Sequence, residues 1–244
     1  MQTQKIIDEI KDAEFRICDY VLETPLLLSK YLSELVGAKV YLKMESEQHT
    51  GSFKFRGAIN KILSLSDEEK KCGIVTASTG NHGRGVGRSS RIVGVNGVLF
   101  LPDNTEEEQA NIIASYGLKT RCHGGSSVSA EMHAKTYAED HGMVWISPYN
   151  DSKVIGGQGT IAVEMLKQLP EIDCVLATIG GGGLMSGVGT YLKSNKSVVE
   201  VVGCQPENSP EMYLSVKAGH IVPPVGKETL SEASAGGIEE GSIT

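Results

Sequence analysis

The segment Gly51-Ser52-Phe53-Lys54-Phe55-Arg56-Gly57-Ala58 places a lysine between two phenylalanines, in a run that begins and ends near a glycine. Two flanking aromatic rings indicate a partly dry site, and removal from water disfavours the charged form of an amine. We therefore expect Lys54 to be partly neutral, and nucleophilic, near pH 7. On these residues alone an exposed lysine at the start of an amphipathic helix stays an alternative.

Two further segments lie between an apolar, strand-like run and a helix-like run. The first is Thr76-Ala77-Ser78-Thr79-Gly80-Asn81-His82-Gly83, and the second is Gly180-Gly181-Gly182-Gly183-Leu184-Met185-Ser186-Gly187. Lys54 also follows a strand-like run, at Lys39–Met44. Ligands of parallel sheets bind beyond the carboxyl ends of the strands. The pattern therefore predicts that all three segments lie at strand ends, as a ligand site requires.

Strand-like and helix-like runs alternate along the chain, which predicts an α/β fold with parallel sheets covered by helices. Cys174–Ile179 is almost wholly apolar, as expected of a buried parallel strand. Lys5–Leu22 predicts a helix that ends before Thr24-Pro25, because the residue before a proline avoids the helical conformation. A second helix is expected at Gly159–Leu169, after a turn-rich segment at 148–151.

The composition bounds the class of protein. The 244 residues include 40% hydrophobic residues and carry a net charge of −7, which is typical of a soluble globular protein and argues against nucleic acid or an anionic membrane as the main partner. No apolar run approaches the roughly 20 residues of a membrane-spanning helix. The N-terminal residues lack a signal-peptide pattern. Five widely spaced cysteines fit reduced thiols in the cytoplasm.

Four consecutive glycines, Gly180–Gly183, precede a helix-like run. Their backbone N–H groups can gather round one anion because no Cβ interferes, and a helix N-terminus adds partial positive charge. A phosphate is the expected ligand, while a tight connection between strand and helix stays an alternative. A dinucleotide site is disfavoured, because the acidic residue expected about 20 positions on would be Glu200, at the start of a strand rather than its end.

Taken in order, the three segments resemble those of the fold-type II family of pyridoxal-phosphate (PLP) enzymes, and most of all serine/threonine dehydratases and serine racemases. The resemblance runs from about Thr24 to the end of the chain. It implies PLP as cofactor and two open, mostly parallel sheets flanked by helices, as in the tryptophan synthase β type. Residues 73–150 would form a small mobile domain. Residues 1–72 and 151–244 would form a larger one, incomplete at the C-terminus because family members usually continue beyond Thr244.

The resemblance also implies roles for individual residues. Lys54 would form the Schiff base with PLP and accept a proton, and the other cofactor-binding positions would be Phe53, Asn81, Gly180, Gly181, Gly182, Gly183 and Leu184. The substrate carboxylate would meet Ser78, Thr79, Gly80 and His82. Ser52 and Arg56 match the family pattern, with mainly structural roles expected. A small amino-acid substrate and a homodimer are expected as partners.

Thr79 departs from the family pattern. Serine racemases have a serine here, which acts as a second acid/base on the opposite face of the cofactor, and threonine dehydratases typically have alanine. The first hypothesis is β-elimination of a hydroxy amino acid such as L-serine or L-threonine, giving a 2-oxo acid and ammonia. Racemisation, with Thr79 as the second catalytic group, is the alternative reaction. An inactive or regulatory chain is an alternative of a different class.

The segment Gln205–Glu211 resembles a loop that binds Mg²⁺ or Ca²⁺ in this family. The matching positions are Gln205, Ser209 and Glu211. Gln205 is a neutral residue where the family has an acidic one, and hard cations favour carboxylates. A strand-to-helix loop with Glu211 in the first helical turn stays the alternative.

Overall fold

A four-stranded parallel sheet, in the order β5-β4-β3-β6, forms the centre of residues 74–145. The computed structural model describes residues 2–225 and 227–244. The strands are β3 (Ile74–Ala77), β4 (Gly97–Leu101), β5 (Lys119–Cys122) and β6 (Val144–Trp145). β3 is buried along its whole length, as a strand covered on both faces has to be.

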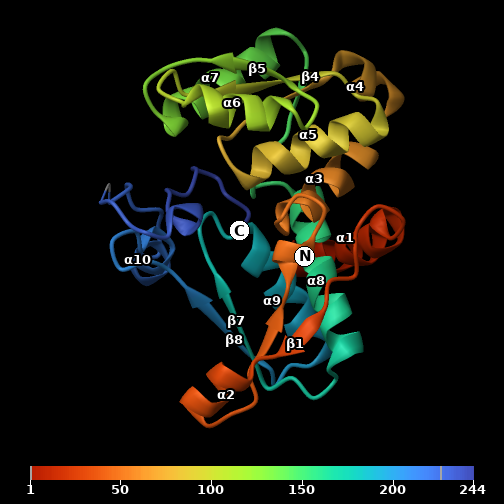
Figure 1. Cartoon of the computed structure of the whole chain (residues 1–244), viewed down its shortest axis with the longest axis vertical. Coiled ribbons are helices and arrows are strands. Elements are labelled where there is room, and N and C mark those ends of the chain that lie inside the picture. Colours follow the sequence, from red (N-terminus) through yellow and green to blue (C-terminus); the bar gives the residue numbers. More distant parts are fainter. Residues whose placement is uncertain (1, 226) are drawn as a thin grey trace.

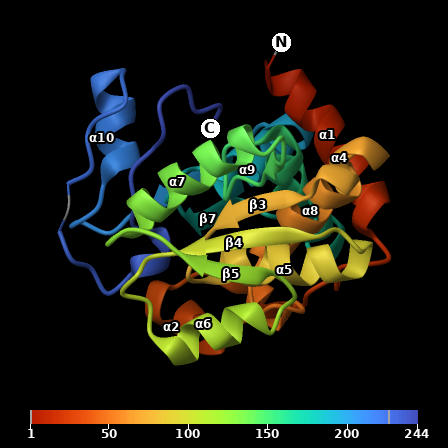
Figure 2. The ribbon, with the colours of Figure 1, turned by 90° about the horizontal axis from the view of Figure 1, so that it is seen from above.

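Helices cover both faces of this sheet (Figure 2). On one face α7 (Ser127–Asp140) packs Ala134 and Ala138 against Val75 and Phe100. On the other face lie α5 (Asn81–Val93) and α6 (Glu107–Ala114), which follow β3 and β4 in the chain. The short α4 (Asp67–Cys72) leads into β3. The expected α/β fold with parallel strands is confirmed.

The remaining strands form two separate pairs (Figure 1). β1 (Leu26–Leu28) and β2 (Tyr41–Lys43) are antiparallel and flank α2 (Lys30–Val36), whereas β7 (Cys174–Thr178) and β8 (Glu200–Cys204) are parallel. α9 (Gly183–Asn195) joins β7 to β8, and α10 (Glu211–Ala218) follows β8. The expectation that β7 is wholly buried is wrong: Val175 packs inward, but Leu176 on the opposite face is 66% exposed.

Three helices connect the parts of the chain: α1 (Gln2–Ile17), α3 (Lys54–Leu63) and α8 (Ser152–Gln168). α3 packs against both α5 and α8. α1 ends five residues earlier than expected. α8 begins at Ser152, not Gly159, because the Asp151 carboxylate caps the N–H groups of Lys153 and Val154.

Residues 74–145 lie at one end of the molecule and the β1-β2 and β7-β8 pairs at the other, with α3 and α8 between (Figure 1). The division into a larger and a small mobile domain stays a prediction. Within the described part of the chain, no helix combines the length and apolar character needed to cross a membrane.

Candidate active site

Lys54 is the first residue of α3, and its amine donates a hydrogen bond to the carbonyl oxygen of Pro148 over 2.8 Å. The Phe53 ring centroid lies 5.4 Å from the Lys54 nitrogen. Burial lowers the pKa of Lys54 from 10.5 to about 8, because the surrounding protein replaces water that would stabilise the ammonium form. The expected direction of this shift is confirmed.

Phe55 does not contribute to this environment. Its side chain is fully buried and packs with Ile17 and Ile59 in a separate cluster. Neighbouring residues of a helix point about 100° apart, so α3 turns Phe55 away from the side of Lys54. One flanking phenylalanine, not two, lies beside the amine.

Arg56 fixes the start of α3. Its guanidinium is fully buried and donates to the carboxylates of Glu45 and Glu164 at 2.6–2.9 Å. Ser52 contributes as well, because its hydroxyl accepts a hydrogen bond from the Lys54 N–H at 3.2 Å. These contacts give Ser52 and Arg56 the structural roles expected of them. They hold the Lys54 backbone in place.

His82 lies in the first turn of α5 and is 4% exposed. Its Nε2 is 3.1 Å from the carbonyl oxygen of Ile146, which also accepts the Thr76 hydroxyl. A carbonyl oxygen only accepts, so Nε2 carries the proton and Nδ1 does not. Burial, reinforced by the charge of Lys54, lowers the pKa of His82 to about 3. Nδ1 is therefore a buried acceptor, without a partner among residues 2–225 and 227–244.

The loop before α5 brings the other predicted substrate positions to the same helix end. The Ser78 hydroxyl accepts from the Gly80 N–H at 3.1 Å, and Gln109 donates to the Thr79 carbonyl. Gly80 is the N-cap residue of α5, and no side chain accepts a hydrogen bond from the first N–H groups of this helix at the cap. The first N–H groups of α5, starting at Asn81, thus keep free donor capacity. A Cβ on Gly85 would lie 3.2 Å from Lys54 backbone atoms, so α5 and Lys54 are close neighbours.

The glycine run forms the uncapped N-terminus of α9. Gly182 is the N-cap, with φ of +91°, which suits glycine, and no side chain caps the helix. A Cβ on Gly181 would lie 2.4 Å from the Tyr149 ring, and one on Gly183 2.9 Å from the Tyr149 backbone. Gly180 has ordinary contacts only, the nearest at 3.5 Å. Leu184 follows in the first helical turn.

Residues 147–150 join Lys54 to the glycine run. Pro148 accepts the Lys54 hydrogen bond, and the next residue, Tyr149, packs on Gly181 and Gly183. The Ser147 hydroxyl accepts from the N–H of Asn150 at 3.0 Å, which shapes the turn. Sequence reasoning identified a turn here but not these contacts. The signal that points to them is the position of Pro148 and Tyr149, just beyond the end of β6.

The predicted cation loop joins β8 to the start of α10. The Glu211 side chain accepts hydrogen bonds from the Ser209 hydroxyl at 2.6 Å and from the Val225 N–H at 3.0 Å. Burial raises the pKa of Glu211, but these hydrogen bonds outweigh it and lower the pKa. The Gln205 amide oxygen accepts from the Tyr213 N–H. This donor set fits a hard cation poorly, and a metal at Gln205, Ser209 and Glu211 stays a prediction.

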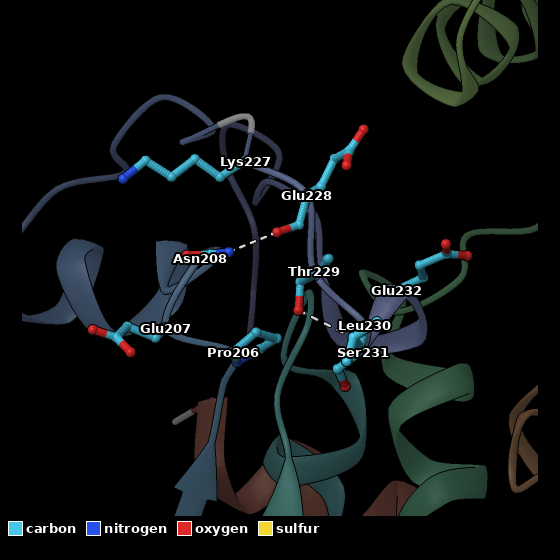
Figure 3. A pocket seen from close by; sticks show the side chains of 10 residues that line it. Pro206, Glu207, Asn208, Lys227, Glu228, Thr229, Leu230, Ser231 and Glu232 are labelled. Atoms are coloured by element: carbon cyan, nitrogen blue, oxygen red, sulfur yellow. Dashed lines mark hydrogen bonds between the residues drawn. The ribbon is translucent and has the colours of Figure 1, made fainter.

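A surface hollow of about 1030 Å³ lies next to that loop (Figure 3). Lys54 and His82 do not line it. Its glutamates Glu207, Glu228 and Glu232 point in different directions, and Asn208 donates to the Glu228 carbonyl across it. Within the described ranges, no three His, Cys, Asp or Glu side chains are grouped to hold a metal. The hollow is therefore separate from the chemistry at Lys54.

The sequence model of one protein family, described as pyridoxal-phosphate dependent enzyme, matches residues 17–244. The chain belongs to this family. It is 40% identical to an L-threonine ammonia-lyase of Thermotoga maritima over 229 residues, 94% of this chain and 57% of the relative. It is 38% identical to the catabolic L-threonine dehydratase TdcB of Staphylococcus aureus, over 85% of this chain and 61% of the relative. The chain thus spans about three fifths of these relatives' length.

Solved structures of fold-type II PLP enzymes superpose well on this chain. Maize serine racemase, 33% identical, aligns with a TM-score of 0.91 over 96% of this chain and 71% of that one. The processed threonine deaminase isoform 2 of Solanum lycopersicum, 32% identical, aligns with a TM-score of 0.92 over 98% of this chain and 65% of that one. The resemblance expected from the three segments is confirmed.

The residues present fit PLP. The buried amine of Lys54 suits an aldehyde, and the uncapped N-terminus of α9 suits a phosphate. Pro148 contacts the Lys54 amine, and Tyr149, the next residue, contacts the glycine run at the N-terminus of α9. The unpartnered Nδ1 of His82 adds an acceptor beside Lys54.

Proposed function

We propose that this chain is a PLP-dependent ammonia-lyase that eliminates water from a β-hydroxy amino acid such as L-serine or L-threonine, giving a 2-oxo acid and ammonia. The environment of Lys54 carries this proposal: its pKa is lowered to about 8, and Pro148 and Tyr149 connect it to the glycine run. The relatives named L-threonine ammonia-lyase and L-threonine dehydratase support the substrate class.

Bound PLP would supply the electron sink for breaking the Cα–H bond. Lys54 would bind the aldehyde end and accept the Cα proton at Nζ. Its pKa of about 8 means that about half of the amine is neutral, and able to accept a proton, near pH 8. Gly180–Gly183 and Leu184 would hold the phosphate with backbone N–H groups. Phe53 would pack near the ring, and Asn81 would hydrogen-bond the hydroxyl oxygen of the ring.

The substrate carboxylate would bind at the N-terminus of α5, to the loop of Ser78, Thr79, Gly80 and His82. Backbone N–H groups are the donors we infer, because α5 has no side-chain cap. The His82 imidazole would not bind the carboxylate, because its free Nδ1 carries a lone pair. That atom would instead accept a hydrogen bond from an N–H or O–H group.

Racemisation is the second candidate reaction. The Thr79 hydroxyl makes no hydrogen bond within residues 2–225 and 227–244, so it is available as a proton donor. The likeness to maize serine racemase favours the same alternative. An inactive or regulatory chain would bind PLP without turnover.

The proposal includes a homodimer in the cytoplasm. All five cysteines are unbonded, which fits a reducing compartment. Exposed apolar side chains on β1 and α2, among them Leu27, Tyr31 and Leu35, offer a surface for a second copy. Light scattering after size-exclusion chromatography measures the mass directly, and a single 26.1 kDa species would contradict the dimer.

The test combines a spectrum with product analysis. PLP bound to Lys54 should give a visible absorption band, and added L-serine or L-threonine should yield pyruvate or 2-oxobutanoate with equimolar ammonia. Chiral chromatography detects D-serine in the same mixture. A band without any product would support the inactive alternative, and absence of the band in folded protein would contradict PLP binding.

A further inference from the structure

Residues 239–244 are held against two segments that lie far from them in the sequence. The backbone N–H of Glu239 donates a hydrogen bond to the Tyr149 hydroxyl at 2.8 Å. The Thr244 hydroxyl donates to the carbonyl oxygen of Gly181 at 2.7 Å. This part of the chain therefore runs along both the turn before α8 and the glycine run before α9.

Lys135, on α7, reaches the same part of the chain. Its amine forms ion pairs with Glu239 and, within α7, with Glu131 at 3.1 Å. The Lys135 and Glu239 side chains are 31% and 24% exposed, so solvent screens their charges only in part. The amine also lies 5.6 Å from the centroid of the Trp145 ring. Lys135 thus links α7 to residues 239–244.

Glu239 makes two contacts that depend on each other. Its carboxylate pairs with Lys135, and its N–H group bonds Tyr149. Burial disfavours the charged form of Lys135, but the hydrogen bonds to Glu239 and Glu131 outweigh burial and raise the pKa of this amine. The amine is therefore charged at neutral pH. Because both contacts belong to one residue, fixing the carboxylate also restricts where the N–H group can lie.

We propose that Lys135 and Glu239 are positioning residues for the phosphate site, because their ion pair holds Tyr149 in place against the glycine run. A Cβ on Gly181 would lie 2.4 Å from the Tyr149 ring, so the place of this ring sets the place of the glycine backbone. The inference rests on the proposed binding of phosphate by Gly180–Gly183. Through this chain of contacts α7 is coupled to the start of α9, and coupling of this kind is reciprocal.

Fluorescence titration with PLP tests this role. Lys135→Met and Glu239→Gln should each weaken PLP binding by about fivefold, as expected for the loss of a partly exposed ion pair. The double variant should bind PLP no more weakly than the weaker single variant, because the two residues act as one pair. Glu131→Gln is the matched control: it removes the other carboxylate from Lys135 and leaves Glu239 in place, so its affinity should stay within about twofold.

Hydrogen exchange of the cofactor-free protein gives a readout that does not depend on PLP. The amides of residues 236–244 should exchange about fivefold faster in Lys135→Met and Glu239→Gln than in the unmodified chain, because the ion pair no longer opposes local opening. Glu131→Gln should leave their exchange unchanged. In the unmodified chain, adding PLP should slow the same amides, because the coupling acts in both directions.

The two readouts together decide the proposal. Faster exchange with unchanged PLP affinity would overturn it, and so would weaker PLP binding with unchanged exchange. Losses that add in the double variant would also overturn it, because the two residues would then act separately. PLP binding that ignores the pair would leave the proposed phosphate site intact, whereas no PLP binding by the folded, unmodified chain would contradict that site and the positioning role alike.

Discussion

The Lys54 amine and the Pro148 carbonyl oxygen are joined by a hydrogen bond of 2.8 Å. The next residue, Tyr149, packs on Gly181 so closely that a Cβ there would lie 2.4 Å from the ring. Burial raises the pKa of Tyr149 to about 12, and its hydroxyl accepts the N–H of Glu239 at 2.8 Å. Two consecutive residues thus contact both the amine and the glycine run.

Lys54 should carry the cofactor. Borohydride reduction of the PLP-loaded protein, followed by peptide mapping, should place the pyridoxyl label on Lys54, because burial makes this amine neutral at a lower pH than an exposed lysine. Lys61 is the matched control: it lies on the same helix but pairs with Asp151 at 2.8 Å. Label on Lys61 or another lysine, with Lys54 clean, would refute the assignment.

The reactivity of Lys54 should depend on pH in a characteristic way. In the cofactor-free protein, its modification by an amine reagent should reach half of the maximal rate near pH 8, compared with about 10.4 for exposed lysines. The folded chain releases this proton before the unfolded chain does, so stability should rise with pH between about 8 and 10.5. Lys54→Met should lack that increase. A half-maximal rate near pH 10 for Lys54 would contradict the environment described here.

Gly181 and Gly180 should differ sharply when each is changed to alanine. The added methyl group of Gly181→Ala meets the Tyr149 ring at 2.4 Å, whereas that of Gly180→Ala meets nothing closer than 3.5 Å. Gly181→Ala should therefore weaken PLP binding by about tenfold or more, as misplaced donors lose about 1.4 kcal/mol or more, and Gly180→Ala should weaken it by less. Fluorescence titration with PLP measures both. Equal affinities would mean that Tyr149 does not set the position of the glycine run.

The chemistry of single segments was predictable because it depends on local properties. Glycines without Cβ atoms, just before a helix, predict an uncapped N-terminus, and the structure has one at Gly182. An aromatic neighbour predicts a lowered pKa for Lys54, and burial lowers it. Which neighbour matters could not be predicted, because the turn of α3 directs Phe55 into the core.

The predicted start of α8, at Gly159, was too late for a local and a tertiary reason. The local one is the Asp151 carboxylate, which caps the N–H groups of Lys153 and Val154. Gly156, Gly157 and Gly159 weaken a helix locally, so the sequence indicates a late start. In the folded chain a Cβ on Gly157 would lie 2.5 Å from the Arg56 carbonyl oxygen, and one on Gly159 2.5 Å from Ile10. These glycines allow α8 to pack closely on its neighbours, and that packing outweighs propensity. Likewise, the contact between Tyr149 and Gly181 joins distant segments and leaves no local signal.

The buried ion pairs of Arg56 should be important for stability. Arg56→Met leaves Glu45 without its cation and Glu164 with Lys43 alone, at positions where the two glutamate side chains are only 14% and 13% exposed. Loss of one partner of a buried pair costs about 3 kcal/mol or more in the free energy of unfolding. Arg91→Met, at an exposed arginine, should change it by about 0.5 kcal/mol at most. Urea unfolding compares the two, and similar values would contradict the structural role of Arg56.

The choice between elimination and racemisation should depend on Thr79. Elimination needs Lys54 to take the Cα proton and an exit for the hydroxyl group. Racemisation needs, in addition, a donor on the opposite face, and the Thr79 hydroxyl is without a partner in the described part of the chain. Its methyl group narrows the loop, and Gln109 holds its carbonyl, so we expect elimination to dominate.

Thr79→Ala should leave dehydration of L-serine or L-threonine largely intact and abolish any racemase activity. Thr79→Ser should raise racemisation relative to elimination, by less than the roughly 10²–10⁴-fold that one positioned acid or base contributes. The measurement is the ratio of D-serine to pyruvate formed from L-serine by each variant. PLP affinity is the control, because neither change touches Lys54 or the glycine run. If Thr79→Ala destroys dehydration while the fold and PLP binding survive, Thr79 takes part in elimination itself and the division of roles is wrong.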